Sequence, residues 1–100
     1  MNQPAVVEML TFRVPVGERA AWLDVEERTW SRFLERQNGF VRKEMWADRN
    51  DPDLLHAVIW WEDETLWKSI PADELAAVDA AMGPWFRECT LTVFDVAREG

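Results

Sequence analysis

One stretch, residues 54–67 (LLHAVIWWEDETLW), constrains the fold of this chain more than any other. Its first part, Leu54–Trp61, is apolar at every position except His56 and is rich in β-branched and aromatic side chains. That composition is typical of a strand buried on both faces. Asp63 then fits a helix N-cap, because its carboxylate can accept hydrogen bonds from the first amides of a helix. The sequence therefore predicts a covered central strand that leads directly into a short helix.

The rest of the chain supplies partners for that strand. Three further segments have the β-branched and aromatic content of strands, and two have apolar residues at helical spacing. We expect strands over residues 5–14, 39–48 and 90–97, helices over 18–37 and 63–70, and another helix from Pro71 to an interruption at Gly83-Pro84. The order is strand, helix, strand, strand, helix, strand. It predicts an α+β, ferredoxin-like βαββαβ fold, with an antiparallel sheet that carries its helices on one face.

The composition restricts the partners of the chain. One hundred residues are expected to form a single domain, residues 1–100. A net charge of −8 repels phosphate groups, so no nucleic acid and no anionic membrane is an expected partner. No stretch reaches the roughly 18 apolar residues that span a bilayer, and no secretory signal is visible. We therefore expect a cytoplasmic protein.

A lone histidine and a lone cysteine give no basis for a metal site. His56 and Cys89 are the only residues of their types, and metal centres need a cluster of ligands. We expect no disulfide, no metal and no other cofactor. Cys89 is expected to be a buried, inert thiol. The apolar residues at helical spacing in the last helix are expected to form core: Leu75, Val78, Met82 and Phe86.

His56 is the first candidate for chemistry, because histidine alone has an ordinary pKa near neutrality. The predicted hairpin pairs Trp46 with His56, Glu44 with Val58, and Arg42 with Trp60. His56 is then either a hydrogen-bonded core residue or a catalytic base oriented by a carboxylate. Glu44 would lie diagonal to it, and Glu26 above it if that face meets the helices.

Glu26 is the second candidate. At about 100° per residue, the long helix gathers Trp22, Trp30 and Phe33 on one face, with Glu26 among them. Its carboxylate is either paired with a cation or faces a ligand cavity. The candidate catalytic residues are thus His56 and Glu26. The candidate ligand-binding residues are aromatic side chains that could stack on a planar molecule: Trp22, Trp30, Phe33, Trp46 and Trp60.

With these features the chain resembles the antibiotic-biosynthesis-monooxygenase-like proteins of the dimeric α+β barrel superfamily. The resemblance rests on Gly39-Phe40-Val41, on the charged loop Asp48–Asp53, and on a strand that ends in Trp61-Glu62-Asp63-Glu64 before a helix. It covers about residues 5–97. The resemblance implies a homodimer with sheets packed face to face, and a ligand cavity between each sheet and its own helices.

The resemblance also implies a range of functions. Members include cofactor-independent monooxygenases acting on polycyclic aromatic compounds, haem-degrading proteins, and proteins of unknown role. The haem-degrading members carry a histidine in the helical region after the strand-ending tryptophan, whereas residues 62–88 contain none. Two hypotheses stay open: a metal-free enzyme acting on an apolar aromatic or quinone-like molecule, and a non-catalytic or stress-related dimeric binding module.

Overall fold

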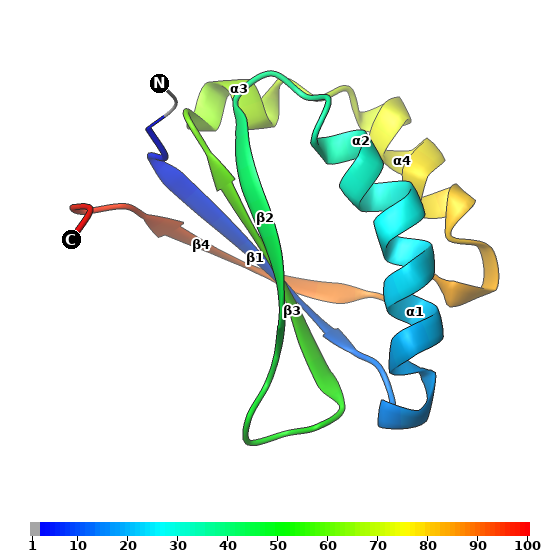
Figure 1. Ribbon diagram of the computed structural model, residues 1–100. Coiled ribbons are helices and arrows are strands. Elements are labelled where there is room, and N and C mark those ends of the chain that lie inside the picture. The colour runs from blue at the N-terminus through cyan, green and yellow to red at the C-terminus, as the bar shows by residue number, and fades with distance from the viewer. Residues whose placement is uncertain (1–2) are drawn as a thin grey trace.

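The computed structural model describes residues 3–100 and contains a four-stranded antiparallel sheet of order β2-β3-β1-β4 (Figure 1). Its strands are β1 (Val6–Arg13), β2 (Phe40–Ala47), β3 (Leu54–Trp61) and β4 (Cys89–Asp95). The sheet order and the alternation of strands and helices confirm the predicted α+β, ferredoxin-like fold. Each strand lies within two residues of its predicted bounds, because their apolar and β-branched runs end at clear turn signals.

The predicted long helix is a continuous helical segment with a π-helical turn in its middle. It comprises α1 (Arg19–Glu26), the π-helical η2 (Glu27–Ser31) and α2 (Arg32–Leu34), and a short 3-10 turn η1 (Val16–Glu18) precedes it. Such π turns widen a helix locally and often occur at functional sites.

The second helical region follows the same pattern as its prediction. It comprises α3 (Glu64–Lys68), α4 (Ala72–Ala81) and the 3-10 turn η3 (Gly83–Trp85). Asp63 caps α3 by accepting hydrogen bonds from the amides of Thr65 and Leu66. Figure 1 shows α1, α2 and α4 on one side of the sheet, and no element of residues 3–100 covers the other side. None of the helices in this range is long and apolar enough to cross a membrane.

The strand register is the predicted one. β2 pairs with β3 so that Trp46 faces His56, Glu44 faces Val58, and Arg42 faces Trp60. Alternation along β3 then sends Leu55, Ala57, Ile59 and Trp61 toward the helices and His56, Val58 and Trp60 to the opposite, outer face.

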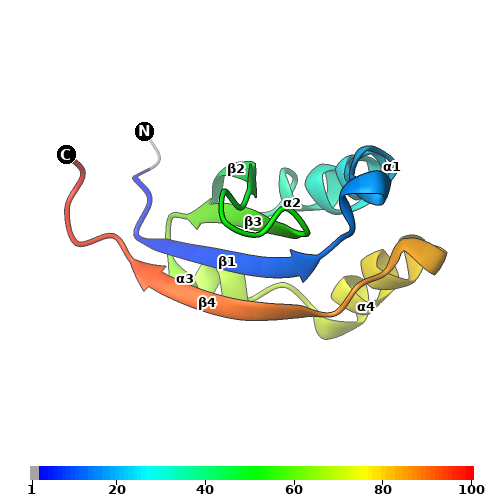
Figure 2. The same cartoon turned by 90° about the horizontal axis from the view of Figure 1, so that it is seen from below.

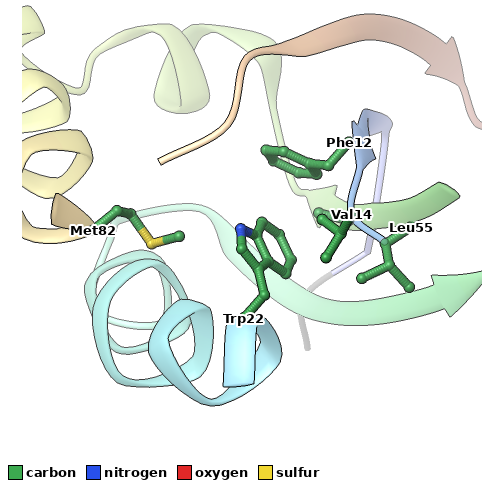
Figure 3. Close-up of a cluster of buried hydrophobic side chains, with 6 residues drawn as sticks. Phe12, Val14, Trp22, Leu55 and Met82 are labelled. Carbon is green, nitrogen blue, oxygen red and sulfur yellow. The ribbon is translucent and has the colours of Figure 1, made fainter. Parts of the chain in front are cut away.

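The helix-facing side holds the core. Figure 3 shows Trp22 of α1 inserted between Phe12 of β1 and Met82, which follows α4. The Trp22 and Phe12 rings lie 4.9 Å apart, and the Trp22 indole donates a 2.9 Å hydrogen bond to the Trp85 carbonyl. Burying so large a ring with its N–H satisfied fixes the distance between α1 and the sheet.

β4 departs from the expectation of a covered strand. Figure 2 shows it beside β1 at the edge of the sheet, and all seven of its residues are exposed. Two predictions are therefore wrong. Cys89 is exposed rather than buried, because it begins the exposed edge strand. Phe86 is 44% exposed rather than core, because η3 breaks the helical spacing after Met82.

A candidate functional site between the sheet and the helices

A cavity of about 300 Å³ lies between the sheet and its own helices, as the family resemblance implies. Its floor comes from β1, β2 and β3, and its walls from α1, η2, α2, α4 and the segment that leads into β4. Most of the lining is apolar or aromatic, and six lining side chains are charged. The lining includes Glu8, Phe12, Trp22, Glu26, Trp30, Lys43, Trp67, Asp79, Phe86, Arg87, Glu88 and Cys89.

The structure divides the candidate aromatic residues between two places. Trp22 and Trp30 line the cavity. Phe33 lies just behind the lining, with its ring edge-on to Trp30 at 5.9 Å. Trp46 and Trp60 lie on the outer face of the sheet instead, in edge-on contact at 6.1 Å. Helical spacing thus identified Trp22 and Trp30 as cavity residues. Strand alternation instead directs the side chains of Trp46 and Trp60 to the outer face of the sheet.

Glu26 is both ion-paired and part of the cavity wall. The Lys43 Nζ lies 2.8 Å from Glu26 Oε2, and the two side chains are 8% and 3% exposed. Lys43 also donates to the Ser31 hydroxyl at 2.7 Å, which joins the π turn to β2. The partner is Lys43 rather than Arg42 or His56, because alternation turns Lys43 toward the helices and Arg42 away from them.

Glu8 is a cavity carboxylate that the sequence reasoning missed. It is only 7% exposed, and its Oε1 accepts a 2.9 Å hydrogen bond from the Trp61 indole. Burial raises the pKa of Glu8 above its ordinary value, against the opposing effects of the Trp61 hydrogen bond and the Lys68 charge. Its signal in the sequence is strand alternation, since Glu8 stands in phase with the helix-facing Val6, Leu10 and Phe12.

Two further carboxylates and a thiol complete the polar lining. Asp79, on α4, has its pKa raised by burial, with a smaller opposing effect from a hydrogen bond of Trp30. Partial burial raises the pKa of the Cys89 thiol, and the negative charges of Asp79 and Glu8 raise it further. Both carboxylates therefore lie near Cys89, although β1, α4 and β4 are far apart in the sequence. Glu88 is exposed at the rim.

His56 lies outside the cavity, on the outer face of the sheet. Its Nε2 donates a 2.9 Å hydrogen bond to Asp48, and its Nδ1 lies 2.9 Å from the Thr11 hydroxyl. The His56 hydrogen bond lowers the pKa of Asp48, and backbone amides of the turn add to the effect. The sheet separates His56 from Glu26, so the structure does not bring the two candidate catalytic residues together. Glu44 accepts from Trp46 instead.

The cavity has the features needed to bind a planar organic molecule and to move a proton. Aromatic rings offer stacking surfaces, and Glu8 offers a buried carboxylate whose raised pKa makes it a stronger base than an ordinary glutamate. Within residues 3–100, no three histidine, cysteine or acidic side chains are placed to hold a metal ion.

Comparison with known proteins supports this description at the level of the fold. No protein-family model matches the sequence, and no curated protein matches it. Among solved structures, the chain is similar to a monooxygenase of Streptomyces coelicolor from the gene ActVA-Orf6, in complex with nanaomycin D. The TM-score is 0.79 at 13% identity, over 96% of this chain and 90% of that one.

Two other solved structures point to the same group. A variant of SnoaB, a cofactor-independent oxygenase from Streptomyces nogalater, matches with a TM-score of 0.71 at 22% identity, over 97% of each chain. A protein from Bordetella bronchiseptica, described as an antibiotic biosynthesis monooxygenase, matches with a TM-score of 0.76 at 15% identity, over 96% of this chain and all of that one. The chain therefore has the fold of the antibiotic-biosynthesis-monooxygenase-like proteins, as the resemblance of its sequence predicts.

Proposed function

We propose that this protein is a homodimer that binds an apolar aromatic or quinone-like molecule in each cavity and oxygenates it without a cofactor. The observation that carries the proposal is the cavity itself. It combines about 300 Å³ of space, aromatic walls and the buried carboxylate of Glu8. That volume lies at the lower end of the range for small-molecule sites, and it suits a ligand of two or three fused rings.

The chemistry needs a base and an electron-rich substrate. A carboxylate takes a proton from an activated ring CH₂ group, and the resulting carbanion passes electrons to O₂ and binds the oxygen. Loss of water from the peroxide leaves a ring carbonyl, so CH₂ and O₂ become C=O and H₂O. Glu8 is the better base of the two buried glutamates, because Lys43 already neutralises Glu26.

The similar structures support the oxygenase part of the proposal. One is a monooxygenase in complex with nanaomycin D, and another is a cofactor-independent oxygenase. The outer face of the sheet supports the dimer, because the large side chains of Trp46 and Phe94 on it are 44% and 48% exposed. Apolar surface of this kind on an uncovered sheet face is typical of a protein interface.

Anthrone provides a direct test, because its central CH₂ group is acidic and its oxidation product, anthraquinone, absorbs at a different wavelength. We expect the protein to accelerate oxygen uptake and anthraquinone formation over buffer alone. Glu8→Gln should lower kcat by about 100-fold or more, the usual contribution of a general base. Glu99→Gln removes the same charge from the exposed C-terminal tail and should leave turnover unchanged. Equal activity in wild type and Glu8→Gln would remove Glu8 from the mechanism.

A second candidate function is a non-catalytic binding module. It is favoured by the pairing of Glu26 with Lys43 and by the position of His56 on the far side of the sheet, which remove both predicted catalytic residues from the chemistry of the cavity. Quenching of tryptophan fluorescence by anthrone, without any turnover, would select this function over the oxygenase.

A further inference from the structure

We propose that the ligand of this cavity is cationic: a planar aromatic molecule that carries a protonated amine, with the amine held between Asp79 and Glu88 near the rim. This inference rests on the proposed function, since it names the class of ligand that the same cavity takes. It is carried by the balance of charge in the lining and by the order in which the carboxylates follow the cavity from floor to rim.

The lining carries more negative charge than its own cations can neutralise. It contains four carboxylates, from Glu8, Glu26, Asp79 and Glu88, and two cations, from Lys43 and Arg87. Both cations are engaged with other groups. Lys43 lies 2.8 Å from Glu26, and Arg87 lies 2.8 Å from Glu18, which is not part of the lining.

Three carboxylates therefore line the cavity without an ion-pair partner among residues 3–100. Glu8 is the most telling of them. It is 7% exposed and accepts one hydrogen bond, from Trp61 to Oε1, while no donor from residues 3–100 reaches Oε2. The Lys68 charge also acts on Glu8, but the two side chains form no ion pair. A buried carboxylate without a counter-charge is costly, and a cation bound elsewhere in the same cavity lowers that cost.

The three unpaired carboxylates differ in their exposure to solvent. Glu8 is buried on the sheet floor, Asp79 is half-buried on α4, and Glu88 is exposed at the rim. A cleft with charges of one sign and low-dielectric walls concentrates ligands of the opposite sign. This arrangement attracts a cation to the mouth of the cavity, and it repels carboxylate or phosphate ligands.

The rest of the lining selects an organic cation over a metal ion. No three acidic, histidine or cysteine side chains of the described chain are placed to coordinate a metal. The partly exposed ring of Trp30 supplies apolar and cation-attracting surface in the same lining. A fused-ring amine fits this lining, since its ring lies on Trp30 and its ammonium group reaches Asp79.

Three probes with the same ring system test the proposal: 1-naphthylmethylamine, 1-naphthalenemethanol and 1-naphthoate, which are cationic, neutral and anionic at pH 7. Binding is measured by calorimetry and by quenching of tryptophan fluorescence. We expect the amine to bind at least tenfold more tightly than the alcohol, and the naphthoate to bind most weakly. In Asp79→Asn the preference for the amine should fall at least threefold, while affinity for the alcohol stays the same. Glu99→Gln is the control for net charge, and it should keep the preference.

The outcomes separate this inference from the proposed function. Equal binding of the amine and the alcohol overturns the cationic ligand and leaves the aromatic site in place. Tightest binding of naphthoate overturns the cationic ligand too. Failure of all three probes to bind overturns the aromatic site, and this inference with it. An amine preference that survives in Asp79→Asn, with near-ultraviolet circular dichroism showing an intact fold, overturns the assignment of the rim to the ammonium group.

Discussion

The two faces of the sheet carry charged groups that are satisfied in different ways. On the outer face, the partly exposed His56 hydrogen-bonds both Asp48 and Thr11. On the helix-facing side, Glu26 is neutralised by Lys43, but Glu8 has no cation beside it although it is almost fully buried. Polar groups that hydrogen-bond or ion-pair with each other stabilise the fold, whereas a buried charge without a partner can interact with a ligand. The difference places the candidate site under the helices.

The largest expected effect is a difference in stability between two substitutions on opposite faces of β2. Lys43→Met removes a buried ammonium and leaves Glu26 unpaired, which should cost about 3–5 kcal/mol of unfolding free energy. Arg42→Met changes the neighbouring residue, which faces outward and is 55% exposed, and should cost less than about 1 kcal/mol. Urea melts at one protein concentration measure both. Equal losses of unfolding free energy would show that the charged residues on the two faces contribute equally to stability.

The two faces should also differ in their effect on assembly. Phe94 lies on the outer face opposite Val7, and Phe86 lies at the rim of the cavity; they are 48% and 44% exposed. Phe94→Asp places a charge in the proposed interface and should raise the dimer dissociation constant at least about tenfold, a cost of 1.4 kcal/mol or more. Phe86→Asp should leave the dimer intact. Light scattering over a dilution series gives both masses, and a monomer from Phe86→Asp alone would move the interface to the helix side.

The smallest expected effect is a pH dependence of opposite sign on the two faces. Because burial raises the pKa of Glu8 above 4.5, the folded state holds this proton more tightly than the unfolded state. Its contribution to stability is therefore lost as pH rises above 4.5 through the folded-state pKa. Glu8→Gln should be more stable than wild type at neutral pH, and the gap should close as the pH falls to 4.5.

Asp48 gives the opposite case. The His56 hydrogen bond lowers the pKa of Asp48 below 3.8, so its contribution is present above 3.8 and is lost as the pH falls through the folded-state pKa. Asp48→Asn should thus be less stable than wild type at neutral pH and approach it in acid. Thermal melts from pH 3 to pH 8 measure both variants. If both variants were more stable than wild type at neutral pH, or both less stable, one of the two causes would be wrong: burial for the Glu8 pKa or hydrogen bonding for the Asp48 pKa.

The sequence by itself determined most of the fold. The apolar run Leu54–Trp61 marked the central strand, and its flanking turn signals set the register that places Trp46 opposite His56. The period of two along β3 then decided which of its side chains face the helices. These features depend on neighbours within one or two strands, so local spacing was enough to predict them.

Only the tertiary structure decided which charged groups share the cavity. Glu8, Asp79 and Glu88 come from β1, α4 and the segment before β4, and their positions depend on how α4 docks and where η3 turns the chain. Glu26 was predicted to be either paired or cavity-facing, and it is both, because Lys43 reaches it from β2 while its carboxylate stays in the wall. Sequence spacing fixes the direction of a side chain within its own element. The docking of separate elements, through contacts such as Trp22 between Phe12 and Met82, decides which of those side chains meet.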